Sequence, residues 1–442
     1  MKLFGTDGIR GEAGHPPLDD GTVVRVGAAL AATATHAPRV VIGRDTRESG
    51  AAIEMALARG IVAAGGTVTS LGVVPTPAVA YLARSDGFDL GVVISASHNP
   101  FHDNGIKVFS GAGEKFTAAQ ELDIERRVAD PGFVVETGVA PPIASGAALI
   151  AHYVAHLRRI LDHAGPLAGH RIVIDCANGA TTRIAPDLFR ALGFDVQAIG
   201  VAPDGRNINA GCGSTAMEGL QQAVVASGAR LGVAFDGDGD RALFVDHLGR
   251  RVDGDAVMLI CTDLLRRDGA LDGGAIVATV MSNIGLELAL QERGVGLVRC
   301  AVGDKYVMEE MLKRGLALGG EQSGHVIFAR HLFTGDGIAT ALQVLRALIA
   351  TGVDLATLAS ALTSYPQVLV NVRVRARTDV STVPQVARAM QDVEARLAGQ
   401  GRLLVRYSGT EPLLRIMLEG KDQAEITAWA NEIADAVRTT LA

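Results

Sequence analysis

One short stretch of the chain carries residue types suited to covalent catalysis. The apolar run 90–94 has the length and composition of a buried strand, and it ends in Ser95-Ala96-Ser97-His98-Asn99-Pro100. The Asn-Pro pair directs the chain away from helical geometry, and Asn104-Gly105 predicts a turn. An exposed Ser97 on a rigid strand end, with Lys107 close behind in the sequence, meets the needs of a nucleophile or phosphate carrier. Alone, the stretch is equally compatible with a serine-rich capping loop and a surface lysine.

Three aspartates alternate with glycines after a second apolar run. Asp236, Asp238 and Asp240 face one way if the backbone is extended. Carboxylates so placed repel one another unless a cation lies among them, and a hard divalent ion, most simply Mg²⁺, resolves this; an acidic turn in solvent is the alternative. A calcium EF-hand is excluded because its sixth and twelfth positions, here Arg241 and His247, require Gly and Glu. Arg241 beside the carboxylates indicates a phosphoryl oxygen shared by the ion and a guanidinium.

A third polar loop has residues suited to a sugar. Glu321, Ser323 and His325 alternate between glycines. Glu321 and Ser323 suit hydrogen bonds to sugar hydroxyls or an amine, and His325 suits proton transfer, although a lone histidine is as often structural. Arg10 is a candidate for phosphate binding. His98, beside the serine, is either a phosphate donor or a structural residue.

A fourth loop resembles a small phosphate cradle. Arg406 offers a fork of donors, and Ser408, Gly409 and Thr410 add hydroxyl and backbone donors. A surface hairpin loop is the alternative. The following Glu-Pro favours a defined turn.

The elements that position these loops follow one plan three times. Strands and helices alternate, which predicts βαβ units and largely parallel sheets. The predicted strands are 40–43, 67–74, 90–94, 172–174, 195–199, 231–235, 275–279, 296–300 and 316–318. The predicted helices between them are 51–64, 76–83, 182–192, 217–226, 284–292 and 305–313. After Pro366 the pattern changes to strands 368–374, 403–405 and 414–418 with helices 383–397 and 423–439.

The fold class predicted is α/β, with three successive α/β domains of mostly parallel mixed sheets and a smaller C-terminal α+β domain. The predicted boundaries give domain I (1–150, serine loop), domain II (151–252, metal loop), domain III (253–365, sugar-contacting loop) and domain IV (366–442, phosphate-binding loop). Ligands of open α/β sheets bind at the carboxyl ends of strands. Because the polar loops follow strand ends, the four domains are expected around one cleft.

Composition limits the remaining possibilities. A chain of 442 residues accommodates two to four domains, and a net charge of −7 argues against nucleic-acid or anionic-membrane partners. The cysteines are dispersed without a C-x-x-C pair, which predicts reduced thiols: Cys176, Cys212, Cys261 and Cys300. The N-terminal residues form no signal peptide and no apolar run reaches membrane length, so we expect a cytoplasmic protein.

A phosphorylatable serine, a divalent-ion site, a sugar-sized loop and a second phosphate cradle together describe a phosphosugar mutase. In motif order from Phe4 to about Gly420, the chain resembles the α-D-phosphohexomutase superfamily and, within it, the phosphoglucosamine mutase family. The narrower resemblance rests on Phe-Gly-Thr-Asp-Gly-Ile-Arg-Gly (4–11), Gln322 and Gly409. Lys305 departs from it, since the family more often has Arg there, and a lysine keeps the charge without the bidentate geometry.

The resemblance implies a role for each candidate residue. Ser97 matches the phosphorylated serine and Lys107 the candidate general base. The other implied roles are catalysis by His325 and Arg10; substrate binding by Glu321, Ser323, Arg406, Ser408, Gly409 and Thr410; phosphate stabilisation by Arg241 and His98; and Mg²⁺ binding by Asp236, Asp238, Asp240 and the phosphate of Ser97.

The resemblance also implies the reaction. It is the interconversion of glucosamine 6-phosphate and glucosamine 1-phosphate through phospho-Ser97, an isomerase step toward UDP-N-acetylglucosamine and peptidoglycan precursors. Glucosamine 1,6-bisphosphate is the implied intermediate and a possible activator. An activating kinase or autophosphorylation would first load Ser97, in a monomer or homodimer.

Two alternatives stay open, and a third is weaker. The nearest is a phosphomannomutase/phosphoglucomutase of the same superfamily. A catalytically silent sugar-phosphate sensor would have lost the serine or an aspartate, and all are present. A hydrolase is disfavoured because the chain lacks G-x-S-x-G.

Overall fold

The structure is a computed structural model that describes residues 2–5, 7–136, 143–408 and 412–441. The chain forms two compact units. One comprises Met1–Met281 and Val295–Ala361, and the other Ser282–Gly294 and Leu362–Ala442. Across the described ranges, no helix combines the length and the apolar character needed to cross a bilayer.

The first unit contains three sheets that share one strand order. The order is β5-β4-β2-β3 in the first sheet, β10-β9-β7-β8 in the second and β15-β14-β12-β13 in the third. In each, the first pair is antiparallel and the other two pairs are parallel. The predicted plan of three similar α/β domains with mostly parallel mixed sheets is confirmed. Each of the three polar loops connects a central strand to its antiparallel neighbour.

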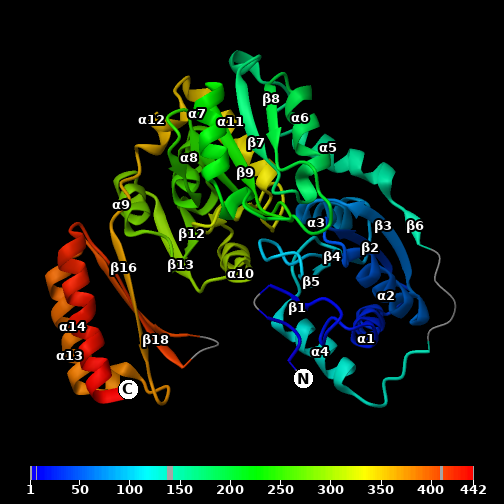
Figure 1. Ribbon diagram of the computed structural model, residues 1–442, viewed down its shortest axis with the longest axis horizontal. Helices are drawn as coiled ribbons and strands as arrows, with labels where there is room; N and C mark the ends of the chain where they lie inside the picture. Colours follow the sequence, from blue (N-terminus) through cyan, green and yellow to red (C-terminus); the bar gives the residue numbers. More distant parts are fainter. Residues whose placement is uncertain (1, 6, 137–142, 409–411, 442) are drawn as a thin grey trace. The chain divides into compact units, whose positions relative to one another are not determined.

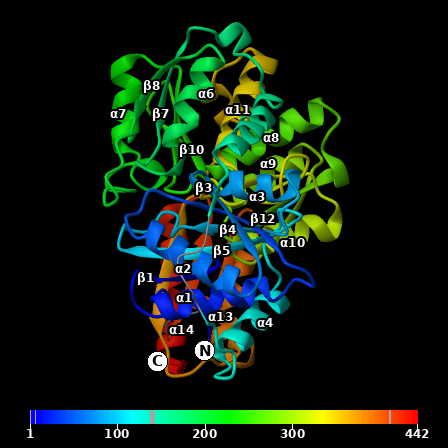
Figure 2. The same cartoon turned by 90° about the vertical axis from the view of Figure 1, so that its right-hand side faces the viewer.

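The first sheet carries the serine stretch on its fully buried strand β4. Its strands are β1 (Ile9–Glu12), β2 (Arg39–Arg44), β3 (Thr67–Val73), β4 (Leu90–Ile94), β5 (Asp103–Ser110) and β6 (Ala144–Ser145). Its helices are α1 (Asp20–Ala31), α2 (Gly50–Ala63), α3 (Thr76–Ser85) and α4 (Ala118–Ala129). Helices α1 and α2 lie side by side in both views (Figures 1 and 2). Their apolar faces join β2 and β4 in one core.

The turn predicted at Asn104-Gly105 is wrong, because both residues lie within β5. The chain turns earlier, where Asn99 N–H donates to the Ala96 carbonyl. Asn104 is fully buried and donates through its side chain to Ser49 at 2.8 Å. Inside a sheet, an asparagine with a bonded side chain does not need a turn.

The second sheet carries the aspartates between β9 and β10. Its strands are β7 (Arg171–Asp175), β8 (Asp195–Ile199), β9 (Leu231–Phe235), β10 (Ala242–Asp246) and β11 (Arg251–Val252), with helices α5 (Ile150–Arg158), α6 (Ala185–Ala191) and α7 (Glu218–Ser227). The helix predicted at 182–192 is broken into a 3₁₀ turn, Ala180–Arg183, and α6. Pro186 lies in the first turn of α6, where its missing N–H and fixed φ favour the start of a new helix.

The third sheet carries the sugar-loop residues between β14 and β15. Its strands are β12 (Ala275–Thr279), β13 (Gly296–Cys300), β14 (Leu318–Gly320) and β15 (Val326–Phe328), with helices α8 (Gly254–Arg267), α10 (Asp304–Arg314), α11 (Gly337–Thr351) and α12 (Leu355–Ala359). The strand predicted at 316–318 begins at Leu318. Leu316 N–H instead donates to the Met311 carbonyl, which closes the end of α10 at the left-handed Gly315.

The second unit contains a three-stranded antiparallel sheet of order β16-β18-β17. Its elements are α9 (Ile284–Glu292), β16 (Gln367–Arg373), α13 (Pro384–Leu397), β17 (Arg402–Tyr407), β18 (Leu413–Glu419) and α14 (Gln423–Leu441). Figure 1 shows α13 and α14 side by side against this sheet, and the three elements share one apolar core. The smaller C-terminal α+β domain is thus confirmed. The domain boundaries and the arrangement of four domains around one cleft stay predictions.

Candidate active site

The serine loop, residues 95–102, connects β4 to β5 and holds Ser97 in an unusual conformation. Ser97 is 1 % exposed with a left-handed φ of 51°, which costs a non-glycine residue about 1–3 kcal/mol and persists only when its surroundings hold it. Ser97 N–H donates to the Ser95 hydroxyl at 2.9 Å, and the Asn209 side chain donates to the Ser97 carbonyl at 2.9 Å. The Ser97 hydroxyl is thereby directed at Asp236 and donates to its Oδ2 at 2.5 Å.

The aspartate loop, residues 236–241, connects β9 to β10 and lies against the serine loop. A Cβ at Gly237 would lie 2.5 Å from the Ser97 carbonyl oxygen, so glycine is what permits this approach. Because the two loops are in contact, Ser97 is buried, and the expectation of an exposed serine is wrong. Helix N-termini from the other two sheets bind the same loop: Thr76 N–H donates to the Asp238 carbonyl at 2.8 Å, and Gly337 N–H to the Gly239 carbonyl at 3.0 Å.

The three predicted metal ligands fit a divalent cation. One oxygen from each of Asp236, Asp238 and Asp240 lies within 4.8 Å of the other two, and all three residues are buried. In the part of the chain that the structure describes, Oδ1 of Asp238 and Oδ1 of Asp240 have no hydrogen-bond partner. Burial, followed by the charges of Asp240 and Asp238, raises the pKa of Asp236 well above its ordinary value. The two oxygens without a hydrogen-bond partner and the mutual repulsion of the carboxylates fit a cation at this place, and their hard oxygen donors suit one such as Mg²⁺.

Lys107 on β5 reaches the aspartate loop. Its Nζ lies 2.8 Å from Asp238 and 3.0 Å from Asp240, and 3.2 Å from Asp7. Burial lowers the pKa of Lys107, but the charges of Asp238, Asp240 and Asp7 outweigh burial and raise it well above the ordinary value. Lys107 is an ammonium in this arrangement. Its predicted role as a proton acceptor would require the loss of one of these contacts and stays a prediction.

Asp7 links Lys107 to a longer chain of alternating charges. Asp7 forms ion pairs with Arg10 and Lys115, and Lys115 forms a further pair with Asp304 at the start of α10. Burial raises the pKa of Asp7, but Lys107, Lys115 and Arg10 together lower it well below its usual range. The chain Asp304–Lys115–Asp7–Lys107 runs from the third sheet's domain to the aspartate loop. Sequence reasoning missed it: Asp7 stands in the same motif as Arg10, but no local pattern marks Lys115 or Asp304.

Three predicted phosphate-binding residues surround the serine loop. Arg10 donates through Nη1 to the Ala96 carbonyl at 2.5 Å. Nη1 of Arg241 lies 3.3 Å from Nδ1 of His98, which in turn lies 3.4 Å from the Ser97 hydroxyl oxygen. Burial, followed by the charges of Arg241 and Arg10, lowers the pKa of His98. A neutral His98 accepts the arginine hydrogen bond. Arg10 thus contacts the backbone of the serine loop and Arg241 contacts the histidine next to Ser97, and their binding of a phosphoryl group stays a prediction.

The sugar loop, residues 321–325, lies beside the aspartate loop. Ala242 N–H donates to the Gly324 carbonyl at 3.1 Å, and Arg241 and His325 form an antiparallel bridge. Glu321 is buried and accepts a hydrogen bond from the Gly303 amide at 3.1 Å, whereas Ser323 is partly exposed. The structure therefore brings the predicted sugar-contacting residues next to the aspartates.

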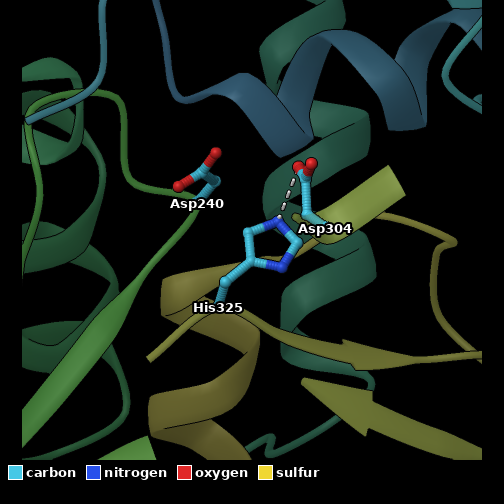
Figure 3. A group of neighbouring side chains, drawn as sticks. All are labelled: Asp240, Asp304 and His325. Carbon is cyan, nitrogen blue, oxygen red and sulfur yellow. Dashed lines mark ion pairs between the residues drawn. The ribbon is translucent and has the colours of Figure 1, made fainter. Parts of the chain in front are cut away.

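His325 lies near two acidic residues. Figure 3 shows the carboxylate of Asp304 pointing at the His325 ring, with Asp240 beside them; Nε2 of His325 lies 3.4 Å from Asp304, and one ligand atom of each of the three residues lies within 4.8 Å of the others. The Gly335 amide also donates to Nε2 at 3.1 Å. Nδ1 is buried and lacks a hydrogen-bond partner among the described residues, so it is the nitrogen left for a further hydrogen bond.

Two residues that bear on the choice of family have structural partners. Gln322 donates through its side chain to Asp253, the N-cap of α8, at 3.2 Å. Lys305 is buried and forms an ion pair with Glu121 of α4 at 2.7 Å. Lys305 thus joins the third domain to the first.

The predicted phosphate cradle lies in the second unit, at the end of β17. Arg406 stands directly opposite Arg415 across the β17–β18 pair, so the two side chains lie on the same face of the sheet. Ser408 is buried; Arg377 donates to its carbonyl at 2.6 Å, and Arg415 Nη2 lies 3.4 Å from its hydroxyl. Sequence reasoning missed Arg415, although strand alternation opposite Arg406 could have indicated it. The rest of the predicted cradle, residues 409–410, lies outside the described residues.

Comparison with known proteins identifies the family. Four family models match the chain in order: phosphoglucomutase/phosphomannomutase alpha/beta/alpha domain I over residues 1–134, domain II over 151–249, domain III over 253–365 and the C-terminal domain over 369–436. The phosphoglucosamine mutase of Syntrophotalea carbinolica is 48% identical over 451 residues, covering 100% of this chain and 98% of that protein. The chain belongs to the phosphoglucosamine mutase family. The phosphoglucosamine mutase of Solibacter usitatus is 49% identical over 442 residues, with 99% and 98% covered.

Solved structures of phosphohexomutases share the fold of this family member. A phosphoglucomutase/phosphomannomutase family protein from Burkholderia thailandensis has a TM-score of 0.79 at 24% identity, with 98% of this chain and 97% of that chain covered. The N-acetylphosphoglucosamine mutase of Aspergillus fumigatus, solved with GlcNAc-6P and magnesium, has a TM-score of 0.66 at 20% identity, with 99% and 95% covered. The resemblance found in the sequence is confirmed, and the family is one of isomerases.

Proposed function

We propose that this protein interconverts glucosamine 6-phosphate and glucosamine 1-phosphate. One observation carries the proposal: the Ser97 hydroxyl donates to Asp236 at 2.5 Å, within a carboxylate cluster that fits a cation. A phosphoserine carries roughly −1.5 to −2 charges at neutral pH. A serine that was only structural would not need a cation site and two guanidiniums around it. Family membership supports the amino sugar as substrate.

The proposed reaction runs through phosphorylated Ser97. The P–O bond to Ser97 breaks as the free hydroxyl of the sugar phosphate attacks phosphorus, which gives glucosamine 1,6-bisphosphate. The other phosphoryl group then returns to the Ser97 oxygen and leaves the isomeric monophosphate. Phosphoryl transfer asks the protein mainly for positioning and charge stabilisation.

Each group of residues has a part in this reaction. The divalent ion, proposed to be Mg²⁺, would neutralise charge on the phosphoryl oxygens while held by the aspartate loop. Arg10 and Arg241 bind the phosphoryl oxygens on Ser97. Lys107 and His325 exchange protons with the reacting hydroxyls, an effect worth on the order of 10²–10⁴-fold. Substrate binding falls to Glu321, Ser323, Arg406, Ser408, Gly409 and Thr410, the last four holding the phosphate that is not reacting.

The proposed reaction also needs a substrate, a source of the first phosphoryl group and a way to reload Ser97. The substrate is a small phosphosugar in the cytoplasm, and a kinase or autophosphorylation loads Ser97 before the first turnover. Glucosamine 1,6-bisphosphate, if it escapes, would reload a dephosphorylated Ser97 and so act as an activator.

Turnover on three sugars tests the proposal. We expect wild-type protein with Mg²⁺ to prefer glucosamine 6-phosphate over glucose and mannose 6-phosphates, and Ser97→Ala to abolish the activity. Ser110→Ala, at the far end of β5, is the matched control and should stay active. A preference for a neutral sugar would favour the phosphomannomutase/phosphoglucomutase alternative. Lack of turnover on all three sugars by phosphorylated protein would refute the proposed mutase function.

A further inference from the structure

A buried arginine, Arg47, donates hydrogen bonds to the backbone of the serine loop. No sequence pattern indicated this residue. The side chain of Arg47 is 0% exposed, and it follows β2 in the sequence Arg44-Asp45-Thr46-Arg47. Its guanidinium donates to four backbone carbonyls in or next to the serine loop: Ser97 at 3.0 Å, Asn99 at 2.8 Å, Asp103 at 2.8 Å and Pro100. One side chain thus fixes the path of the backbone on both sides of the turn.

Asp45 connects the same guanidinium to the other end of Ser97. Arg47 Nε donates to Asp45 Oδ2 at 2.9 Å, and the Ser95 hydroxyl donates to that oxygen at 2.5 Å. The Ser95 oxygen in turn accepts the Ser97 amide at 2.9 Å. Both backbone polar groups of Ser97, the N–H and the carbonyl, therefore lead to the Arg47–Asp45 ion pair.

The sheet brings this pair to the serine. Strands β2 and β4 are parallel neighbours, so their carboxyl ends meet at one edge, where Asp45 N–H donates to the Ile94 carbonyl at 3.1 Å. On its other side, the Thr46 hydroxyl donates to the Asn178 carbonyl of the second domain at 2.6 Å. The segment 45–47 is therefore held by hydrogen bonds to β4 on one side and to the second domain on the other.

We propose that Arg47 is the positioning residue of phosphoryl transfer: through the Ser97 backbone it holds the serine in the left-handed conformation that directs Oγ at the aspartate loop. This inference rests on the proposed function, because what Arg47 sets is the rate of that transfer. A lysine cannot replace it, since an ammonium is a point donor and cannot span four carbonyls and a carboxylate.

The test compares Arg47→Lys with a matched control, Arg25→Lys. Arg25 of α1 likewise donates to backbone carbonyls, those of Val128, Asp130 and Phe133, but these lie in the last turn of α4 and just after it. For Arg47→Lys we expect kcat to fall about 100-fold with KM within about threefold, because a small misplacement of a reacting group costs this much. Arg25→Lys should keep both constants within about twofold. An Arg47→Lys kcat within about threefold of wild type, or an equal loss in both variants, would overturn the proposal.

Two further measurements separate positioning from general destabilisation. Hydrogen exchange should quicken in Arg47→Lys over residues 95–103 and not elsewhere; exchange that quickens throughout the domain would contradict a positioning role. Methylguanidinium should restore kcat to Arg47→Ala. If Arg47→Ala does not fold, Ser95→Ala replaces it and should lower kcat without raising KM.

The proposed function and this inference fail separately. If the wild-type protein turns over none of the three sugar phosphates, the proposed function is refuted. The local exchange experiment would still show whether Arg47 holds the serine loop, and unchanged exchange at 95–103 would refute that hold.

Discussion

The serine loop and the β17–β18 hairpin, the two regions proposed to bind phosphate, are built in different ways. In the serine loop the backbone is left-handed at Ser97 and buried, and side chains from three segments fix its polar groups one by one. In the hairpin, Arg406 and Arg415 lie opposite each other on regular antiparallel strands, and both residues are partly exposed. Covalent transfer depends on geometry within a fraction of an ångström, whereas holding a phosphate depends mainly on charge.

The difference predicts separable kinetic effects. Changes around the serine and aspartate loops should lower kcat and leave KM nearly unchanged, because they alter the reacting atoms. Changes in the hairpin should raise KM, because they weaken binding of the phosphate that does not react.

The largest effect is expected from the aspartate loop. Asp238→Asn should lower kcat by on the order of 10³-fold, because it removes a charge that the bound cation needs. Chelation by EDTA should abolish activity, and added Mg²⁺ should restore it. Asp195→Asn, an exposed aspartate paired with Arg171, is the control. Full activity of chelated protein would contradict the cation site.

The next effect tests the hairpin. Arg406→Ala should raise KM by roughly 10–100-fold while Ser97 can still be phosphorylated, because a charge-assisted hydrogen bond to the substrate is lost. Arg396→Ala, which removes an exposed arginine of α13 paired with Glu432, should change nothing. A fall in kcat without a change in KM would erase the distinction between the two regions.

A smaller effect is expected at Asp7, which forms ion pairs with Arg10 and Lys107, two residues proposed to act in the reaction. Asp7→Asn keeps the shape but removes the charge that faces Arg10, Lys107 and Lys115. We expect kcat to fall about tenfold with KM little changed, because Lys107 and Arg10 lose their orientation. Asp20→Asn, on the exposed surface of α1, is the control. A wild-type kcat in Asp7→Asn would show that the series of ion pairs from Asp304 through Lys115 and Asp7 to Lys107 is structural only.

The smallest effect is expected at Arg415, the second arginine of the β17–β18 hairpin. Arg415→Ala should raise KM about three- to tenfold, less than Arg406→Ala, because it adds to a cradle that Arg406 dominates. Arg415→Lys should recover part of the loss, since the charge remains. If Arg415→Ala binds substrate as wild type does, then its place opposite Arg406 reflects the sheet alone.

The sequence predicted what depends on local pattern. Strand β4 and the loop after it could be read because apolar runs and Asn-Pro signals act over a few residues. The aspartate site could be predicted because residues that alternate along an extended backbone face the same way. The three-fold plan followed from the alternation of strands and helices.

Contacts between residues that are far apart in the sequence could not be predicted. Arg47 reaches Ser97 only because β2 and β4 are adjacent in the sheet, and Asp304 reaches Asp7 only through Lys115. The turn predicted at Asn104-Gly105 is wrong because pairing and burial within β5 outweigh the local preference of Asn-Gly for a turn. Local propensity yields to tertiary packing at such positions.

The central claim, that Ser97 carries the phosphoryl group, has a direct test. Protein phosphorylated at Ser97 would be mixed with glucosamine 6-phosphate and Mg²⁺, quenched within one turnover, and analysed by mass spectrometry of both protein and sugar. We predict that Ser97 loses its phosphoryl group as glucosamine 1,6-bisphosphate forms, at a rate no slower than kcat. Turnover during which phospho-Ser97 stays intact would contradict the account.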